Sequence, residues 1–225
     1  MTETIKLLAF SSDKSDNSNY VNLPETILTK LVNDKIDQPY YFSITSPYSI
    51  KTWVGVRQFT ADEKTINIPR WIMDYLCMFE NSQYVDLKLE KNIPKGKKAI
   101  IEPQEENFFS ISEYDAILEQ ILSDFCILHR NQVLEIEFLD KKYKLLIKDV
   151  EIDWSTVNYD YNNISQILSE GVIDIKNIDL TVDIKNKFFK EKEEVKPTNS
   201  KLDNKNKIND KDDEKIQSKG LKLSE

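Results

Sequence analysis

Short runs of β-branched and aromatic residues, separated by polar clusters, dominate the first hundred residues of this chain. The runs fall at 5–10, 19–23, 39–45, 52–59, 65–68, 84–91 and 98–103. Residues of these types fit the pleated, half-buried surface of a sheet, so each run is predicted to form a strand. The chain is therefore expected to fold as a mainly β protein with few helices.

Two short helices are predicted among these strands. The first spans 24–32 and begins with a proline; its apolar side carries Ile27, Leu28, Leu31 and Val32. The second begins after Pro69, which loses nothing at a helix start by lacking an N–H. Its expected buried stripe consists of Trp71, Ile72, Tyr75, Leu76 and Phe79. Arg70 is expected to be a solvated or locally paired charge, so this corner is interpreted as scaffold.

A different arrangement begins near Phe108. Ser112 and Asp115 are spaced as a helix N-cap, and a helix is predicted at 113–128. Its apolar positions recur at helical spacing, at Tyr114, Ile117, Leu118, Ile121, Leu122 and Phe125. Residues 133–152 are predicted to form a hairpin, with a polar loop at 159–163 and two last strands at 171–175 and 178–184.

Charge and glycine content exclude several classes of protein. The 225 residues carry a net charge of −8 and a pI near 5.0, which argues against binding to nucleic acid phosphates. The sequence contains only four glycines, too few and too scattered for a phosphate-binding loop or a dinucleotide fingerprint. No apolar run approaches the ~20 residues that span a bilayer. A soluble protein that is neither exported nor inserted into a membrane is expected.

The C-terminal segment has a separate character. Residues 190–225 contain no aromatic residue, and 187–225 hold eleven lysines against nine carboxylates, a net charge of +2. Such a segment has too little apolar surface to offset its ordering entropy, so a disordered tail is predicted at 187–225. Within it, the isolated apolar residues of 216–223 (IQSKGLKL) are typical of a short binding motif.

The sole histidine and the two cysteines are the first candidates for chemistry. His129 follows Cys126 by three residues, a spacing that would bring thiol and imidazole to one helix face. Three interpretations stay open: a helix-terminal histidine beside a buried thiol, which we favour, a Cys-His nucleophile pair, and part of a zinc site. Cys77 is likewise expected to be a buried free thiol, with a disulfide between the two cysteines as the less favoured alternative. No catalytic, metal-binding or cofactor-binding residue is predicted.

Carboxylates are abundant and give no sign of catalysis. Glu135 and Glu137 share one face of a predicted strand, with Ile136 and Phe138 on the other. This alternation is typical of a strand with one solvated face.

Several stretches, in order, resemble the ubiquitin fusion degradation protein 1 family over roughly residues 3–190. They are LPETILTKL, GVRQFTADEKTINIPRWIMDYL, VDLKLEKN, IIEPQEENFFSIS, ILEQILSDFCILHRNQVLEIEF, YKLLIKDVE and IDIKNIDLTVDI. The resemblance implies a double-psi β-barrel followed by a small α/β roll. The expected division is therefore a barrel subdomain at 1–105, a roll subdomain at 106–186 and the tail at 187–225.

The resemblance also implies a function. Members of this family are non-enzymatic adaptors that bring polyubiquitinated proteins to a Cdc48-type AAA ATPase for extraction, unfolding and proteasomal degradation, including ER-associated degradation. They work with an Npl4-type adaptor. The family segment that engages this adaptor has no visible counterpart in this sequence, so two alternatives stay open: this chain does not pair with such an adaptor, or it does so through another surface. No residue can be named as a ubiquitin contact from the sequence.

The tail resembles the family's ATPase-binding motif, Phe-x-Gly-x-Gly-x-x-Leu. The corresponding positions are Ile216, Ser218, Gly220 and Leu223, of which two match. The expected location is the cytoplasm, including the ER surface or the nucleus. Low glycine and frequent Lys, Asn and Ile suggest an AT-rich genome, and therefore an alternative: a diverged copy serving protein translocation into a symbiont-derived organelle, in its periplastid compartment, with a cargo other than ubiquitin.

Overall fold

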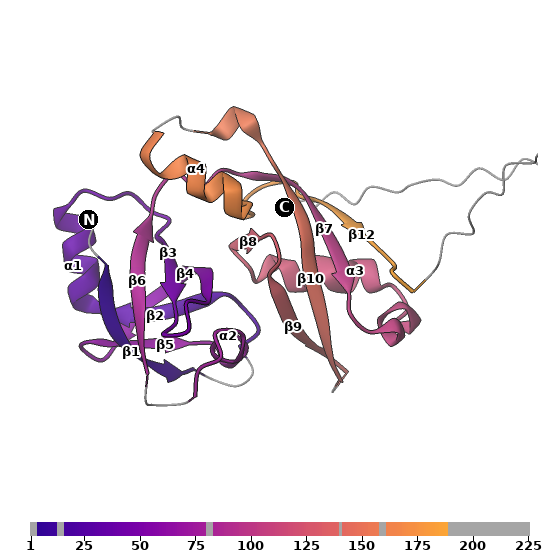
Figure 1. The fold of residues 1–225 in the computed structure, drawn as a ribbon, viewed down its shortest axis with the longest axis horizontal. Coiled ribbons are helices and arrows are strands. Elements are labelled where there is room, and N and C mark those ends of the chain that lie inside the picture. Colours follow the sequence, from indigo (N-terminus) through magenta and orange to yellow (C-terminus); the bar gives the residue numbers. More distant parts are fainter. Residues whose placement is uncertain (1–3, 13–15, 80–82, 140, 158–160, 189–225) are drawn as a thin grey trace, which may run out of the picture.

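The first half of the chain closes into a six-stranded mixed β-barrel (Figure 1). The structure, a computed structural model, describes residues 4–12, 16–79, 83–139, 141–157 and 161–188. The barrel strands are β1 (Ile5–Ser11), β2 (Tyr20–Pro24), β3 (Tyr41–Thr45), β4 (Lys51–Ala61), β5 (Thr65–Ile68) and β6 (Tyr84–Glu90). They follow the order β1-β5-β2-β4-β3-β6 around the barrel. The pairs β1/β5 and β2/β4 are parallel and the remaining pairs antiparallel, which fits the expected double-psi barrel.

Alternating side chains fill the barrel interior. In β6, Val85, Leu87 and Leu89 are buried while Tyr84 and Asp86 are exposed, the period of two that a strand with one buried face requires. The largest fully buried side chains of the barrel strands are Leu23, Phe42, Ile44, Ile66, Ile68 and Leu87. All the strands predicted before residue 92 are confirmed.

Helix α1 (Glu25–Asn33) follows β2 without a break, as the proline at its start predicts. Ile27 and Leu31 are buried and pack against the barrel core. Val32 was expected on the same side, but it is 59% exposed. Successive positions on a helix are 100° apart, so Val32 falls just outside the buried stripe that Leu31 occupies.

Helix α2 (Arg70–Tyr75) is shorter than the predicted stripe. Trp71, Ile72 and Leu76 are buried as expected, and the Trp71 indole donates a hydrogen bond to the Ser18 carbonyl at 2.8 Å. Phe79, however, is 72% exposed. The helical period ends at Tyr75 because the backbone turns at Cys77, whose φ is +55°.

Arg70 forms an ion pair with Asp74 one turn further along α2, at 3.1 Å. Its side chain is therefore a locally paired surface charge, as predicted. Together with the buried Trp71, this pairing confirms that the Pro-Arg-Trp corner belongs to the scaffold.

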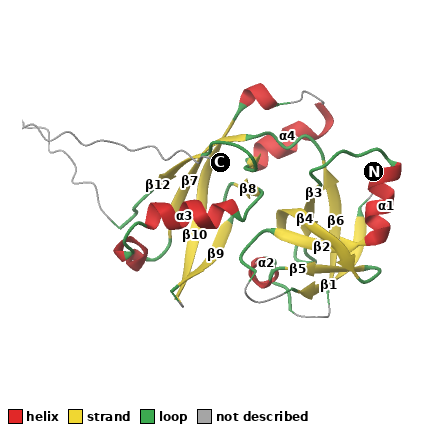
Figure 2. Ribbon diagram, turned by 180° about the vertical axis from the view of Figure 1, so that it is seen from behind, coloured by secondary structure: helices red, strands yellow, loops and turns green. Residues whose placement is uncertain are grey.

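A second unit of sheets and helices follows the barrel. Its four-stranded sheet has the order β12-β7-β10-β9, formed by β7 (Gly96–Pro103), β9 (Val133–Phe138), β10 (Lys141–Ile152) and β12 (Thr181–Ile184). A two-stranded ribbon joins β8 (Ile127–His129) to β11 (Val172–Asp174). Helix α3 (Tyr114–Ser123) crosses one face of the larger sheet, as Figure 2 shows from behind. The remaining elements are α4 (Tyr161–Glu170) and two 3₁₀ turns at Glu106–Ser110 and Trp154–Thr156.

Strand β7 belongs to the second sheet, where it lies between β10 and β12. The strand predicted at 98–103 was expected to be the last strand of the barrel subdomain, which was predicted to span 1–105. The barrel closes with β6 pairing to β1 and β3, which leaves no free edge for a seventh strand. The chain therefore passes from one sheet system to the other between Glu90 and Gly96, although the division into subdomains at 1–105 and 106–186 stays a prediction.

Two helical predictions in the second unit are corrected. Helix α3 ends at Ser123, five residues before the predicted end at 128. It begins after Glu113, which has a φ of +58°, and no side chain caps it, so the expected Ser112 cap is wrong. Second, α4 starts inside the segment interpreted as a polar loop at 159–163. The predicted 133–152 hairpin is confirmed as β9 and β10.

No helix in the described parts of the chain is long and apolar enough to cross a bilayer. Of the predicted tail at 187–225, only Lys187 and Phe188 are described, and both contact the folded part of the chain. The proposed motif residues Ile216, Ser218, Gly220 and Leu223 lie outside the described residues.

Candidate functional site

The barrel and the second unit meet at a buried seam that contains the predicted Cys126 and His129. The apolar part of the seam consists of Tyr41 and Trp53 from the barrel and Cys126, Ile127, Ile167 and Val172 from the second unit. Because α3 has ended at Ser123, Cys126 and His129 lie on an extended segment around β8 rather than on one helix face. The favoured interpretation of a helix-terminal histidine is therefore wrong.

The Cys126 thiol is enclosed and neutral. It is 1% exposed, and its Sγ lies 3.2 Å from the Asn19 side-chain oxygen. Burial raises the pKa of Cys126 to about 12, and the Asp174 carboxylate adds to the effect. A nucleophilic cysteine needs an accessible thiolate at neutral pH, which this environment opposes.

His129 is neutral as well. Its Nδ1 donates to the Arg130 carbonyl at 3.0 Å, which leaves Nε2 to accept from the Thr52 hydroxyl at 3.2 Å. The ring packs edge-on against Trp53, with centroids 4.8 Å apart. The pKa of His129 is lowered from 6.5 to about 4, mainly by burial and to a smaller extent by the Lys51 charge. Cys126 and His129 bond to other residues rather than to each other, and both are neutral at pH 7. They therefore do not constitute an activated Cys-His pair.

One side chain of the barrel completes the hydrogen bonding of β8. The Asn19 amide nitrogen donates to the Ile127 carbonyl at 2.7 Å, and its oxygen accepts from the Cys126 N–H at 2.9 Å. Asn19 is fully buried. It satisfies two backbone groups that would otherwise need a neighbouring strand, because buried N–H and C=O groups must be paired.

Gly55 sets how closely the two units approach. A Cβ atom at this position would lie 2.6 Å from the Cys126 Sγ and 2.8 Å from the Tyr20 ring. Any other residue would therefore push β4 away from the β8 segment. The sequence gives one indication of this contact between β4 and the β8 segment: Gly55 lies inside a predicted strand, where a glycine often marks the close approach of another backbone.

Ion pairs surround the seam. Lys95, on the segment that joins the units, contacts the buried Asp174 carboxylate at 2.8 Å and the Lys176 carbonyl at the same distance. Asp174 in turn accepts from the Lys176 N–H. On the other side, Lys51 of β4 pairs with Glu170 at the end of α4, at 3.1 Å. The seam is thus closed by both apolar packing and charge.

Three exposed aromatic side chains of the barrel unit lie around Gln83. Tyr48, Phe79 and Tyr84 are 52%, 72% and 53% exposed and are called the aromatic patch below. The Gln83 side chain, next to Tyr84, donates to the Tyr48 hydroxyl at 2.9 Å and accepts from the Phe79 N–H at 3.2 Å. Gln83 therefore links the Tyr48 hydroxyl to the backbone at Phe79, while the three rings face solvent.

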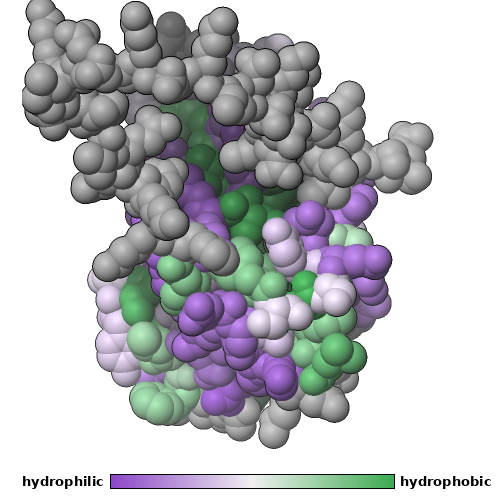
Figure 3. Space-filling view, turned by 90° about the vertical axis from the view of Figure 1, so that its right-hand side faces the viewer, coloured by the Kyte–Doolittle hydropathy of each residue, from purple (hydrophilic) through white to green (hydrophobic). Residues whose placement is uncertain are grey.

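The second unit carries a groove of about 1060 Å³ between α3 and residues 175–179, called the α3 groove below. Its lining combines apolar Leu122, Phe125 and Ile178 with the carboxylates of Glu119 and Asp179. Figure 3, which faces this end of the molecule, shows hydrophobic residues in patches among hydrophilic ones.

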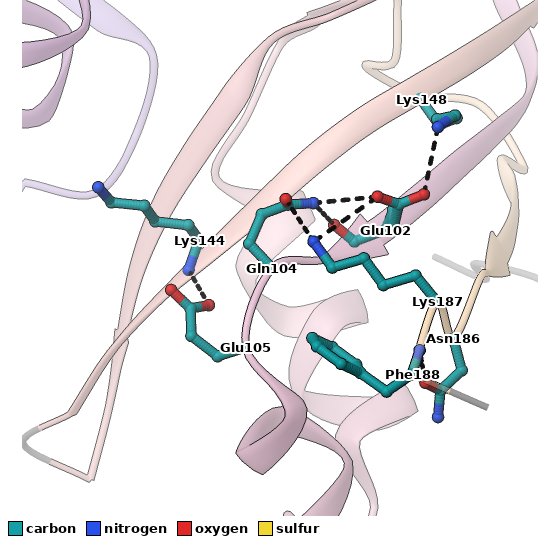
Figure 4. Close-up of polar contacts among 8 residues, drawn as sticks. All are labelled: Glu102, Gln104, Glu105, Lys144, Lys148, Asn186, Lys187 and Phe188. Atoms are coloured by element: carbon teal, nitrogen blue, oxygen red, sulfur yellow. Dashed lines mark hydrogen bonds and ion pairs between the residues drawn. The ribbon is translucent and has the colours of Figure 1, made fainter. Parts of the chain in front are cut away.

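The last described residues are fixed to the second unit (Figure 4). Lys187 donates to the Gln104 side chain at 2.7 Å and lies 3.9 Å from the Glu102 carboxylate. The Phe188 ring contacts the Phe109 ring, with centroids 6.5 Å apart. These contacts place Lys187 and Phe188, the last described residues, against the second unit.

The remaining sequence candidates lie apart from the seam. Glu135 and Glu137 lie on the solvent side of β9, opposite the buried Ile136, and Glu135 pairs with Lys142 at 2.6 Å, as a solvated strand face predicts. Cys77 is exposed, which corrects its expected burial, and both cysteines are free. Among the described residues, no group of three or more His, Cys, Asp or Glu side chains could hold a metal ion.

A closed mixed barrel of the double-psi type, joined through a buried seam to a sheet-and-helix unit, defines a two-part, mainly β domain. Residues 3–92 match the family model for the ubiquitin fusion degradation protein UFD1, N-terminal subdomain 1. This range ends two residues after β6. The chain belongs to the ubiquitin fusion degradation protein 1 family.

Three relatives show the extent of the similarity. The chain is 30% identical to ubiquitin fusion degradation protein 1 of Saccharomyces cerevisiae over 148 residues, which are 64% of this chain and 40% of the relative. It is 30% identical to the Schizosaccharomyces pombe protein of that name over 145 residues, 63% and 42% of the two chains. It is 28% identical to the human ubiquitin recognition factor in ER-associated degradation protein 1 over 154 residues, 67% and 49%. The aligned part thus spans two fifths to one half of these relatives.

Proposed function

We propose that this protein is a non-catalytic adaptor that binds ubiquitinated proteins and delivers them to a Cdc48-type AAA ATPase for unfolding and degradation. The observation that carries the proposal is the family match across the whole barrel. The names of the relatives refer to ubiquitin fusion degradation and to ubiquitin recognition in ER-associated degradation. The buried, neutral state of Cys126 and His129 supports a binding role rather than nucleophilic catalysis.

The aromatic patch is the surface of the barrel best suited to ubiquitin. Ubiquitin is recognised largely through an apolar area, and its partners present apolar surface in return. Tyr48, Phe79 and Tyr84 are each more than half exposed, and Gln83 holds the Tyr48 hydroxyl before any partner arrives. A ring held in this way loses little conformational entropy on binding.

Titration of the full chain with tetraubiquitin is expected to give saturable binding in the micromolar range. Phe79→Ser combined with Tyr84→Ser should weaken binding by about tenfold or more, because each ring contributes ~1.5 kcal/mol or more when buried. Val32→Ser serves as the matched control, because Val32 is 59% exposed but lies on α1.

Two results of this titration would contradict the proposal. Absence of binding to chains of any length at several hundred micromolar would exclude ubiquitin as the ligand. An equal loss from Val32→Ser would exclude the aromatic patch as the contact surface.

The tail residues Ile216, Ser218, Gly220 and Leu223 are proposed to dock to the ATPase. Deleting 214–225 should then strongly reduce capture of the chain by the immobilised ATPase. Deletion of 200–211 removes the same number of residues without touching the motif and should leave capture unchanged. Equal capture of both truncated chains would show that the ATPase, if bound, uses another surface.

The alternative is a diverged copy that serves translocation into a symbiont-derived organelle with another cargo. The frequent Lys, Asn and Ile residues support it. Labelling around a plastid, together with ATPase capture and no ubiquitin binding, would favour this alternative. Diffuse cytosolic or ER-surface labelling would favour the ubiquitin adaptor, for which an Npl4-type protein remains a proposed partner.

A further inference from the structure

The α3 groove combines an apolar floor with an acidic rim. Leu122, Phe125 and Ile175 line it and are almost completely buried, while Ile178 is half-buried. Glu119 on α3 is half-buried and Asp179 on the opposite side is exposed. Within the part of the chain that the structure describes, neither carboxylate has a Lys or Arg at ion-pair distance, in contrast to Glu102, Glu135 and Asp183 on the neighbouring sheet.

The lysine that lines the groove is already engaged. The Lys176 ammonium donates to the Ser123 carbonyl at 2.6 Å and lies 5.5 Å from the centre of the Tyr20 ring. It therefore ties the 175–179 segment to the end of α3. No Lys or Arg among the described residues pairs with Glu119 or Asp179, so the complementary ligand is a short segment with apolar and basic residues.

The chain contains one such segment beyond Phe188. Residues 216–223 (IQSKGLKL) carry three aliphatic side chains, Ile216, Leu221 and Leu223, and two lysines, Lys219 and Lys222, without an Asp or Glu. No other eight-residue window of 189–225 has three aliphatic residues and no acid. The other acid-free stretch of that length, 195–202 (VKPTNSKL), has two lysines but only two aliphatic residues, Val195 and Leu202.

The length of the connection allows this contact within one molecule. Phe188 contacts Phe109, and Phe109 contacts Tyr114, the first residue of α3, with ring centroids 6.5 and 5.9 Å apart. Ten residues of helix are ~15 Å long, so the groove begins within about two helical turns of the point where the chain leaves the fold. The 28 residues from Phe188 to Ile216 can reach up to ~90 Å when extended.

We propose that residues 216–223 dock in the α3 groove of the same chain, with their aliphatic side chains on the apolar floor and Lys219 and Lys222 beside Glu119 and Asp179. The docked segment includes the residues of the proposed ATPase motif, so docking and ATPase binding exclude each other. This mutual exclusion rests on the proposed function, whereas the docking does not.

Paramagnetic relaxation on the full chain tests the docking without any partner. A nitroxide is attached through Ser224→Cys in a Cys77→Ser background, since Cys77 is exposed and Cys126 is buried. The amide signals of Glu119 and Asn177–Asp179 should lose at least half of their intensity and recover when the nitroxide is reduced. Glu119→Lys with Asp179→Lys should abolish most of this loss, and Asp86→Lys, an exposed acid on the barrel, should not change it.

A second set of variants leaves the folded part untouched. Lys219→Glu with Lys222→Glu should also remove the signal loss at the groove. A weak, uniform loss over the whole surface, or a loss at the groove that survives both charge reversals, would overturn the proposal. A mixing experiment tests whether the contact lies within one molecule: an isotope-labelled chain without nitroxide is mixed with an unlabelled chain that carries it. Signal loss on the isotope-labelled chain would also overturn the proposal, because it would mean docking between two copies. Failure to bind ubiquitin or the ATPase would leave this test unaffected.

Discussion

Asn19→Ala is expected to lower the free energy of unfolding by about 3–4 kcal/mol. The substitution leaves the Cys126 N–H and the Ile127 carbonyl buried without partners, and each buried unpaired group costs about 1–3 kcal/mol. Urea unfolding followed by tryptophan fluorescence measures the effect, because Trp53 packs at the seam and Trp71 bonds to Ser18 beside it.

Asn33→Ala is the matched control for this experiment. Asn33 is the exposed last residue of α1, and its removal should change stability by no more than about 0.5 kcal/mol. A loss below about 1 kcal/mol for Asn19→Ala would contradict the role given to Asn19, because water would then be replacing both hydrogen bonds.

Acidification from pH 7 to pH 5 is expected to cost about 2 kcal/mol of stability through His129 alone. The pKa of His129 is about 4 in the folded protein and 6.5 when unfolded. Its contribution is therefore complete above pH 6.5 and is lost as the pH falls through 4, because the unfolded chain takes up the proton first. The full loss is on the order of 3 kcal/mol.

The matched experiment compares the wild type with His129→Gln at pH 7 and pH 5. Glutamine can still bond to Thr52 or Arg130 but does not titrate, so the variant should be less stable at pH 7 and lose about 2 kcal/mol less on acidification. Carboxyl groups add to the acid sensitivity of both proteins mainly below pH 5. Equal pH dependence of the two proteins would mean that His129 is accessible to water in the folded state.

The strands were predictable because their signal is local. Runs such as Thr65–Ile68 and the Glu135–Glu137 alternation carry the period of two in the sequence itself. Helix α4 was missed because its ten residues include Asn162, Asn163 and Ser165, which favour caps and turns in isolation. The contacts of Ile167 in the seam supply the stability that local propensity lacks.

The continuous apolar run around Cys126 fits either a helix or a buried strand, because it has no period that distinguishes them. The choice is made by tertiary contacts: β8 pairs with β11, 45 residues further along, and with the Asn19 side chain, which is 108 residues from Ile127. No window of sequence contains such a partner. The sequence could therefore name Cys126 and His129 as candidates, but it could not predict that both are buried and neutral. That state results from the packing of the two units against each other at the seam.

The seam also bears on how the protein is made and handled. The barrel strands leave the ribosome before β8, so the barrel can close while the Asn19 amide, Tyr41 and Trp53 still face water. A fragment that stops after β6 keeps this unpaired amide and these two aromatic rings exposed permanently. Such a fragment is expected to self-associate. Non-specific binding through its exposed rings would give false positive results in capture assays.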